Sequence, residues 1–487
     1  MINDLTKNAH KGKIIQKRNF KEKIAMQLKF DFNNMMKETL GEKEGLDFQL
    51  FETHKDLLDL AYSKVMDNRG KGWQEWTNLP FYQQDVVKDI LETVKRYQDY
   101  DNVVVFGIGG SALGTIAVAN ALLHLRHNEL EKNVRKFPRL YVEDNVDPER
   151  MQALLDVIDV RKTVFNVITK SGTTSETLSQ YMIIHNILKQ KLNDDAKDNI
   201  IITTTKGKGT LYDIAVKEGY KVFDLGGGVG GRFSVLSPVG LVPLALVGID
   251  INSLLEGARE MSEACFSPEN SKNPALCTAF LQYMSMRKGK NISVMMPYAD
   301  SLKFMSDFYC QIWGESLGKA TDNNNNIVHV GQTPVKALGV TDQHSQIQLY
   351  TEGPFDKVVT FLEVEKYRSN VTIPTAGDYK ETEFLQNKTL NELINYERKA
   401  TEFALTKYKR ANFTITLSEV NAHTVGELLQ YFMYQTAYCG ALLDINTYNQ
   451  PGVEEGKQAT FAMMGRKNYE NKLDEINSLK KDVRYII

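Results

Sequence analysis

The amino-acid sequence predicts an α/β protein with two sheets, each covered by helices. In the first half, five short runs rich in Val, Ile, Phe and Thr alternate with helical patterns, which indicates a doubly wound parallel sheet with right-handed crossovers. In the second half, a similar alternation predicts another parallel or mixed sheet. A length of 487 residues is enough for two or three domains, each with its own core.

The chain begins with a segment that differs from the rest. Lys or Arg occupies seven of the first 25 positions, opposed only by Asp4 and Glu22, so we expect residues 1–25 to form a basic, solvated and flexible arm. Met26 is an alternative natural start, which the intact mass of the native protein would test. Residues 26–100 are predicted to form a helical N-terminal segment, because the apolar spacing from about Leu46 to Tyr100 is helical.

Residues 101–247 are predicted to form the first α/β domain. Its strands are expected at 102–106, 139–142, 163–168, 199–203 and 221–223. In a parallel sheet of this kind, ligands bind beyond the carboxyl ends of the strands. Two polar loops follow such ends directly, and they are therefore the first candidates for a ligand site.

Residues 248–487 are predicted to form the second α/β domain. The expected elements are helices at 273–287, 301–313 and 425–443 and strands at 291–295, 357–364 and 412–417. The four asparagines from Asn323 to Asn326 predict a turn or mobile loop. The most apolar stretch, residues 233–249, is interrupted by Pro and Gly, so we expect buried core rather than a membrane span.

The loop after the third predicted strand indicates a phosphate ligand. Residues 169–177 read TKSGTTSET, in which six of nine residues carry hydroxyls and one is Lys170, and a helical pattern follows. Free backbone N–H groups and the positive dipole end at a helix N-terminus favour an anion, which hydroxyls and a lysine would hold further. The alternative is that these hydroxyls only cap the helix.

The loop after the first predicted strand has a similar design. GIGGSALG, at residues 107–114, lets the backbone approach a ligand closely, and Ser111 stands where the next helix begins. This loop also matches a dinucleotide-binding pattern with Ala112 in the last place, but Glu143 and Asp144 lie further along the chain than the expected acid. No Walker A loop is present.

Composition excludes several function classes. The formal net charge of -2 gives no general attraction to nucleic acid or acidic membranes. Cys265, Cys277, Cys310 and Cys439 form no CxxC unit and show no metal-ligand spacing with the eight histidines, so we expect no metal site. Unpaired cysteines of this kind fit a reducing, cytoplasmic compartment.

Further polar segments, together with the two loops, resemble the glucose-6-phosphate isomerase family from about Lys29 to the C-terminus. They are GGGVGGRFSVLSPVG (226–240), CQIWGESLGK (310–319), GVTDQHSQ (339–346) and LLDINTYNQPGVEEGKQ (442–458). The resemblance implies two sugar-isomerase (SIS-type) α/β/α sandwich domains, a homodimer, no cofactor, and reversible conversion of glucose 6-phosphate to fructose 6-phosphate through a cis-enediol.

The resemblance also assigns roles to four residues. Glu315 matches the carboxylate base that moves hydrogen between C1 and C2, and Arg232 matches the cation beside the developing enediolate oxygen. His344 and Lys457 match the residues that open the sugar ring, and the histidine comes from the neighbouring subunit. Without the resemblance, Glu315 would be interpreted as a solvated residue paired with Lys319, and Arg232 as a surface ion-pair partner.

The remaining matches concern substrate contacts. Glu176 matches the acid that orients the histidine. The phosphate and sugar contacts are expected from Gly110, Ser111, Thr169, Lys170, Ser171, Thr174, Gln311 and Gln450. At 169–171 the chain has Thr-Lys-Ser where the family often has Ser-Lys-Thr or Ser-Lys-Ser, a change that keeps the hydroxyls. The other histidines (His10, His54, His124, His127, His185, His329 and His423) are interpreted as ordinary surface or core residues.

Two other functions are compatible with parts of this pattern. A sugar-phosphate-sensing module would need the phosphate loop only, whereas an isomerase also needs Glu315, Arg232, His344 and Lys457, all of which are present. A nicotinamide dehydrogenase is supported by residues 107–112 alone, and we expect no binding of NAD.

Overall fold

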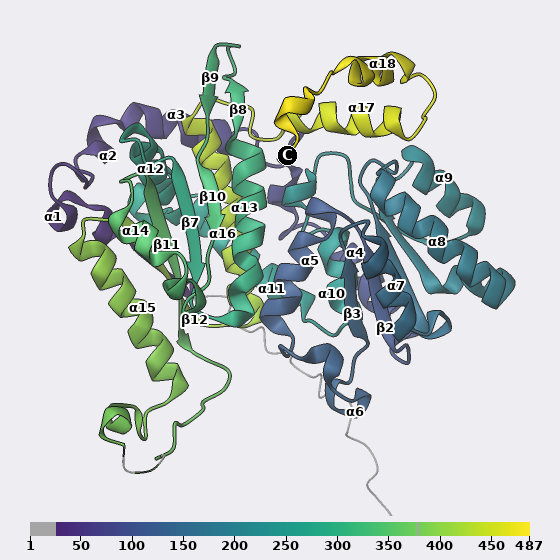
Figure 1. Cartoon of the computed structure of the whole chain (residues 1–487), viewed down its shortest axis with the longest axis horizontal. Helices are drawn as coiled ribbons and strands as arrows, with labels where there is room; N and C mark the ends of the chain where they lie inside the picture. The colour runs from purple at the N-terminus through teal and green to yellow at the C-terminus, as the bar shows by residue number, and fades with distance from the viewer. Residues whose placement is uncertain (1–25, 376, 378) are drawn as a thin grey trace, which may run out of the picture.

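The computed structural model describes residues 26–375, 377 and 379–487, which contain two five-stranded sheets flanked by helices (Figure 1). The predicted α/β class is confirmed. The basic arm predicted at residues 1–25 lies outside the described residues. The domain limits at residues 100 and 247 stay a prediction. The N-terminal segment is not separate from the second half, because its residues 28–31 pair with a strand of the second sheet.

The first sheet is entirely parallel, with the strand order β3-β2-β4-β5-β6. Its strands are β2 (Asn102–Phe106), β3 (Arg139–Glu143), β4 (Thr163–Ile168), β5 (Ile200–Thr204) and β6 (Lys221–Asp224). The three central strands are buried along their whole length, which explains their continuous apolar and β-branched sequences. All five predicted strands are confirmed, with ends that differ by at most one residue.

Helices cover both faces of this sheet. They are α4 (Gln84–Val94), α5 (Leu113–Leu122), α6 (Lys132–Arg135), α7 (Pro148–Val157), α8 (Ser175–Leu192), α9 (Gly209–Glu218) and α10 (Pro238–Leu246). Every residue of α10 is buried, which confirms that the apolar stretch 233–249 is core. In the part of the chain that the structure describes, no helix is both long enough and apolar enough to cross a membrane.

The second sheet is mixed, with the order β1-β12-β11-β7-β10. Its strands are β1 (Leu28–Asp31), β7 (Ile292–Pro297), β10 (Thr333–Lys336), β11 (Lys357–Lys366) and β12 (Asn412–Glu419). All pairs are parallel except β1 with β12. The strands predicted at 291–295, 357–364 and 412–417 are therefore confirmed.

The two edge strands of this sheet were not predicted. The expectation of a helical segment from residue 26 is wrong for its first residues, because β1 is a strand that pairs antiparallel with β12. The paired residues lie near opposite ends of the sequence, for example Leu28 and Leu417. Four residues are too few for a periodic signal. Strand β10 contains Pro334, which lacks the N–H of a central strand but is tolerated at a sheet edge.

One long buried helix, α16 (Ala422–Leu442), packs against α3 (Lys55–Met66), α11 (Ile251–Cys265), α12 (Pro274–Arg287) and α13 (Lys303–Leu317). Further helices are α1 (Lys37–Leu40) and α2 (Leu50–Thr53) near the N-terminus, α14 (Ile347–Glu352) and α15 (Leu390–Lys407) in the second half, and α17 (Glu454–Met463) and α18 (Glu470–Ser478) near the C-terminus. Helix α13 runs further than the predicted 301–313. The predicted turn at Asn323–Asn326 joins β8 (Lys319–Thr321) to β9 (Ile327–Val330).

One apolar core joins the two halves of the molecule. The largest cluster of buried apolar residues includes Val103 of β2 and Val358 of β11, and helix α5 of the first half packs against α13 of the second. This packing places the carboxyl edge of the first sheet, where β2 leads into α5, beside the C-terminal end of α13 (Figure 1). The candidate site lies at this junction.

Candidate active site

The hydroxyl-rich loop lies between β4 and the N-terminus of α8. Oγ1 of Thr169 is 2.6 Å from Oγ1 of Thr174, and Oγ of Ser171 lies within 3.4 Å of Thr169 Oγ1 and 3.3 Å of Thr174 Oγ1. Thr174 is the N-cap residue, yet its side chain makes no capping hydrogen bond. Three hydroxyls therefore converge at a helix N-terminus without serving as caps, which favours the anion site over the capping alternative.

Lys170 connects this loop to the glycine-rich segment before Arg232. Its Nζ donates to the carbonyl of Val229 at 2.6 Å and lies 4.0 Å from the centre of the Trp73 ring. Burial, reinforced by the nearby Lys208 and opposed by Glu75, lowers the pKa of Lys170 to about 8. A bound anion would compensate a buried cation of this kind.

The glycine loop after β2 packs against two of the predicted site segments. A Cβ on Gly110 would lie 2.2 Å from the carbonyl carbon of Gly231 and 2.6 Å from the backbone N of Arg232, so no larger residue fits there. Gly109 has a φ of +57°, and a Cβ at this position would lie 3.0 Å from Nε2 of Gln311. Ser111, half-buried, ends this turn.

Arg232 is the most tightly held of the predicted residues. Only 4% of it is exposed, so the alternative of a surface ion pair is wrong. Its guanidinium donates to Ser316 Oγ (2.7 Å), Gln450 Oε1 (2.7 Å), the Thr447 carbonyl (2.6 Å), the Asn449 carbonyl (3.3 Å) and Glu315 Oε2 (3.5 Å). Burial lowers the pKa of Arg232, and the carboxylate of Glu315 opposes this shift.

Glu315 lies in the last turn of α13, and its side chain is 38% exposed. Its carboxylate faces Arg232 rather than Lys319. Nζ of Lys319 instead donates to the backbone carbonyls of Glu315 (2.8 Å) and Ser316 (2.7 Å), so the alternative of a Glu315–Lys319 side-chain pair is wrong. Burial and the nearby Arg232 lower the pKa of Lys319 to about 8, opposed by Glu315. Arg232 therefore holds one side of the Glu315 carboxylate, and the other side is open to solvent.

The two predicted glutamines border the same centre. Gln311 lies one turn before Glu315 on α13, on the same helix face, and reaches the glycine loop. Gln450 holds Arg232 and precedes the short turn Pro451–Val453 that leads into α17. Four segments that are far apart in the sequence therefore meet around Arg232.

Three predicted residues do not contact this centre in the chain. Lys457, on α17, is exposed and pairs with Glu454 at 2.7 Å. Glu176 lies half-buried in the first turn of α8, and within the described residues no hydrogen bond or ion pair joins it to His344. His344 is exposed at the end of the short helical turn Thr341–His344.

The position of His344 separates it from Glu315. The backbone N–H of Gly339 donates to the carbonyl of Pro297 at 2.9 Å, which places the segment before His344 at the carboxyl end of β7. Helix α13 starts six residues after that strand and carries Glu315 to its far end, a length of about 22 Å for 15 residues. Within one chain, His344 and Glu315 therefore lie at opposite ends of α13.

The structure also adds residues that sequence reasoning missed. Glu75 accepts a hydrogen bond from the backbone N–H of Gly228 at 3.2 Å, and Trp73 lies under Lys170. Both come from the N-terminal segment, and no local signal connects Trp73 to Lys170, 97 residues later, or Glu75 to Gly228, 153 residues later. Ser316 and Lys319, in contrast, belong to the GESLGK segment already singled out, and their contacts follow from their places beside Glu315.

Comparisons with known proteins agree on one family. The family model of phosphoglucose isomerase matches residues 92–482. A glucose-6-phosphate isomerase of Carboxydothermus hydrogenoformans is 50% identical over 469 residues, which cover 95% of this chain and 100% of that protein. One from Methanocaldococcus jannaschii is 36% identical over 90% of this chain and 99% of that protein.

Solved structures show the same fold. A hypothetical protein of Thermus thermophilus superposes with a TM-score of 0.81 at 33% identity and covers 90% of this chain and 100% of that one. A glucose-6-phosphate isomerase of Chlamydia trachomatis superposes with a TM-score of 0.77 at 19% identity, covering 92% of this chain and 96% of that one. At 19% identity, the similarity to the Chlamydia trachomatis structure shows the fold alone.

Proposed function

Since the chain belongs to the phosphoglucose isomerase family, we propose how its residues interconvert D-glucose 6-phosphate and D-fructose 6-phosphate. The reaction is a reversible aldose–ketose isomerisation, a step of glycolysis and gluconeogenesis. The observation that carries the assignment of roles is the pairing of a partly exposed carboxylate, Glu315, with a buried guanidinium, Arg232. Lys170, in the hydroxyl-lined loop before α8, contacts the carbonyl of Val229 in the segment that leads to Arg232.

The phosphate is held at the hydroxyl loop. Thr169, Ser171 and Thr174 offer hydroxyl donors at the N-terminus of α8, where backbone N–H groups also point outward. Lys170 supplies a positive charge, and Gly110 and Ser111, in the turn after β2, would contribute further contacts. Binding of this group orients the sugar chain toward α13.

Glu315 is the base that carries the hydrogen. Its carboxylate takes the proton from C2 of the open-chain aldose while the C1–C2 double bond of the enediol forms. A proton then returns from Glu315 to C1, while the proton of the C2 hydroxyl passes to O1, so that a carbonyl forms at C2 and a hydroxyl at C1. A single carboxylate on the last turn of a rigid helix can serve both carbons, because they are adjacent.

Arg232 stabilises the oxygen that becomes negative in this step. A guanidinium does not lose its proton during the reaction and donates in fixed directions. Its hydrogen bonds to Ser316, Gln450 and the Thr447 carbonyl prevent it from moving with the charge. Gln311 and Gln450 border the space in which the sugar hydroxyls would lie.

Ring opening requires a second copy of the chain. A proton must leave the anomeric hydroxyl and another must reach the ring oxygen, and His344 and Lys457 are the residues that match this task. The distance of His344 from Glu315 within one chain supports a homodimer in which His344 serves the partner's site, with Glu176 there to orient it. Lys457 would reach the substrate by movement of the exposed α17.

Subunit mixing tests the shared site. We expect the Glu315→Gln and His344→Ala homodimers each to be nearly inactive. After dissociation and random reassociation, half of the dimers are mixed, and each has one intact site, so activity returns to about a quarter of the wild-type value. If His344 acts within its own chain, mixing restores nothing.

The regulatory alternative, sugar-phosphate binding without turnover, is not favoured, because the fixed Glu315–Arg232 pair has no role in binding phosphate alone. A coupled assay of fructose 6-phosphate turnover on purified protein, with and without chelator, tests the reaction and its independence of metal. We further propose a cytoplasmic location, which the four free cysteine thiols support.

A further inference from the structure

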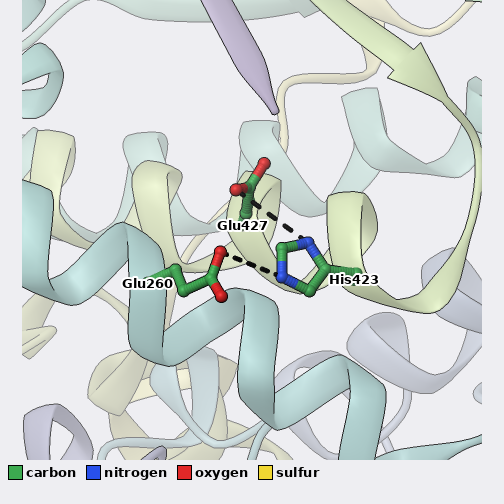
Figure 2. Close-up of side chains that lie close together, drawn as sticks. All are labelled: Glu260, His423 and Glu427. Carbon is green, nitrogen blue, oxygen red and sulfur yellow. Dashed lines mark ion pairs between the residues drawn. The ribbon is translucent and has the colours of Figure 1, made fainter. Parts of the chain in front are cut away.

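A second cluster of ionisable side chains lies far from the active site. Glu260 of α11 and His423 and Glu427 of α16 gather near the N-terminal end of α16, where both carboxylates face the imidazole ring (Figure 2). The contacts of Arg232 with Thr447 and Gln450 lie beyond the opposite end of this helix, about 30 Å away for 21 residues. The cluster therefore has no part in the proposed reaction.

Unusually close packing of α11 and α16 holds this cluster. A Cβ on Gly257 would lie 1.9 Å from the carbonyl oxygen of His423, and a Cβ on Gly426 would lie 2.0 Å from the carbonyl oxygen of Leu254. Only glycines allow the two backbones to approach in this way. Because Glu260 follows Gly257 by three residues, the crossing directs it to the same place as His423 and Glu427, on two rigid elements.

Glu260 and His423 have buried ligand atoms that the protein leaves without hydrogen bonds. Nε2 of His423 is 3.1 Å from Oε2 of Glu260, and Nδ1 is 3.9 Å from Oε1 of Glu427. Oε2 of Glu260 and both ring nitrogens are buried, yet none of them has a hydrogen bond of acceptable geometry. Buried nitrogen and oxygen atoms that lack hydrogen bonds and lie this close together are able to share a metal ion.

Burial makes the negative charge of the cluster costly. The side chain of Glu427 is 0% exposed, and those of His423 and Glu260 are 12% and 14% exposed. Among residues 26–375, 377 and 379–487, neither carboxylate has an ion pair with Lys or Arg. Two carboxylates in such a place stay ionised only with a compensating cation beside them.

We propose that Glu260, His423 and Glu427 bind a divalent transition-metal ion, of which zinc is the best match. One imidazole and two carboxylates supply three protein ligands, and water would complete a tetrahedron. The ligand atoms lie within 4.8 Å of one another, against about 3.3 Å in a tetrahedral zinc site, so small side-chain rotations complete it. Magnesium and calcium, which prefer oxygen ligands only, fit less well.

Such a metal would fasten the N-terminal strand to the core. The carboxylate of Glu427 accepts the backbone N–H of Gln27, at 3.0 and 3.2 Å to its two oxygens, directly before β1. This contact fixes the orientation of the ligand, as outer-shell hydrogen bonds do in known metal sites. Metal binding would therefore link α11, α16 and the start of β1, and its effect would be on stability rather than turnover.

Metal titration of the full chain tests the proposal. The purified protein is stripped with chelator, and zinc is added while heat of binding and thermal unfolding are measured. We expect one zinc per chain, a rise in Tm of several degrees and an unchanged isomerase kcat. With cobalt in place of zinc, a visible absorption band of a low-symmetry site should appear.

Variants locate the bound ion. Glu260→Gln and His423→Gln should each weaken zinc binding by more than about 100-fold and remove the cobalt band. Glu256→Gln is the matched control, because it removes a carboxylate from the same helix, one turn earlier and exposed. Glu260 is at the rim of the cluster, so its variant remains informative if His423→Gln fails to fold.

Two outcomes would overturn the proposal. In one, the wild type binds no zinc, and the NMR spectrum of its imidazole groups shows protons on both nitrogens of His423, which then pairs with the two carboxylates. The other is zinc binding that Glu260→Gln and His423→Gln leave unchanged, which would place the ion elsewhere. Neither outcome affects the proposed isomerase, whose activity is measured separately.

Discussion

The phosphate loop and the Glu315–Arg232 centre are built in different ways. The loop consists of neighbouring residues, Thr169 to Thr174, between one strand and one helix, and its hydroxyls contact each other. The centre joins Arg232, Glu315 and Gln450, which come from three segments more than 80 residues apart. The loop is a local structure, and the centre is a product of tertiary packing.

This difference separates the two tasks of the site. In the proposed role of the loop, hydroxyls, N–H groups and a lysine share the charge of the phosphate, so binding does not depend on one position alone. Hydrogen transfer needs one carboxylate and one cation at fixed positions, because a small displacement lowers the rate strongly. We therefore expect changes in the loop to alter KM and changes in the centre to alter kcat.

The largest effect should come from Glu315→Gln. The amide keeps the size of the side chain but cannot accept the C2 proton, so kcat should fall by about four orders of magnitude, the upper range for a positioned base. Exchange of the C2 hydrogen with deuterated water should stop, while sugar-phosphate binding persists. Asp307→Asn, on the same helix, is the control. Full exchange by Glu315→Gln would remove this residue from its role.

Arg232→Lys should have the next largest effect. Lysine keeps the charge but cannot make the guanidinium contacts with Ser316, Gln450 and the Thr447 carbonyl. We expect kcat to fall by about two to three orders of magnitude, with a smaller change in KM. Steady-state kinetics and a circular dichroism spectrum check this. A KM effect that exceeds the kcat effect would place Arg232 with the phosphate loop instead.

These two regions also differ in how far the sequence predicts them. The strands of the first sheet and the loops at Gly107 and Thr169 follow from local patterns, because strand, loop and helix are contiguous there. The meeting of Arg232 with Gln450 depends on long-range packing, and only the family resemblance anticipated it. The sequence did not predict strand β1 or the cluster at His423 for the same reason. Glu260 lies 163 residues before His423, and no spacing rule connects them.

Lys170→Met tests the prediction that changes in the phosphate loop alter KM rather than kcat. Loss of a charge-assisted contact with the phosphate should raise KM by about 10- to 100-fold and change kcat little. In the wild type, the pKa of Lys170 near 8 means that the free enzyme loses this positive charge as the pH rises through 8. The value of kcat/KM should therefore decline above pH 8, whereas kcat should not, because bound phosphate keeps Lys170 protonated.

Lys208→Met is the companion variant. Removing this neighbouring positive charge should raise the pKa of Lys170 and shift the alkaline decline of kcat/KM to higher pH, without a large change in KM at pH 7. A decline that remains at the same pH in both Lys170→Met and Lys208→Met would assign it to a different group.

The smallest effect on turnover should come from Lys319→Met, which tests whether the centre depends on residues that never touch the substrate. Lys319 donates to the carbonyls of Glu315 and Ser316 and so fixes the end of α13. Its loss should loosen the position of the carboxylate, and we expect a several-fold lower kcat with an unchanged KM and a Tm lower by several degrees. Lys336→Met, which removes a lysine paired with Asp307 in the second turn of α13, should leave kcat unchanged. Lys319→Arg keeps a cationic donor and should restore part of kcat. If Lys319→Met lowers Tm alone, the rigidity of the centre does not come from this helix end.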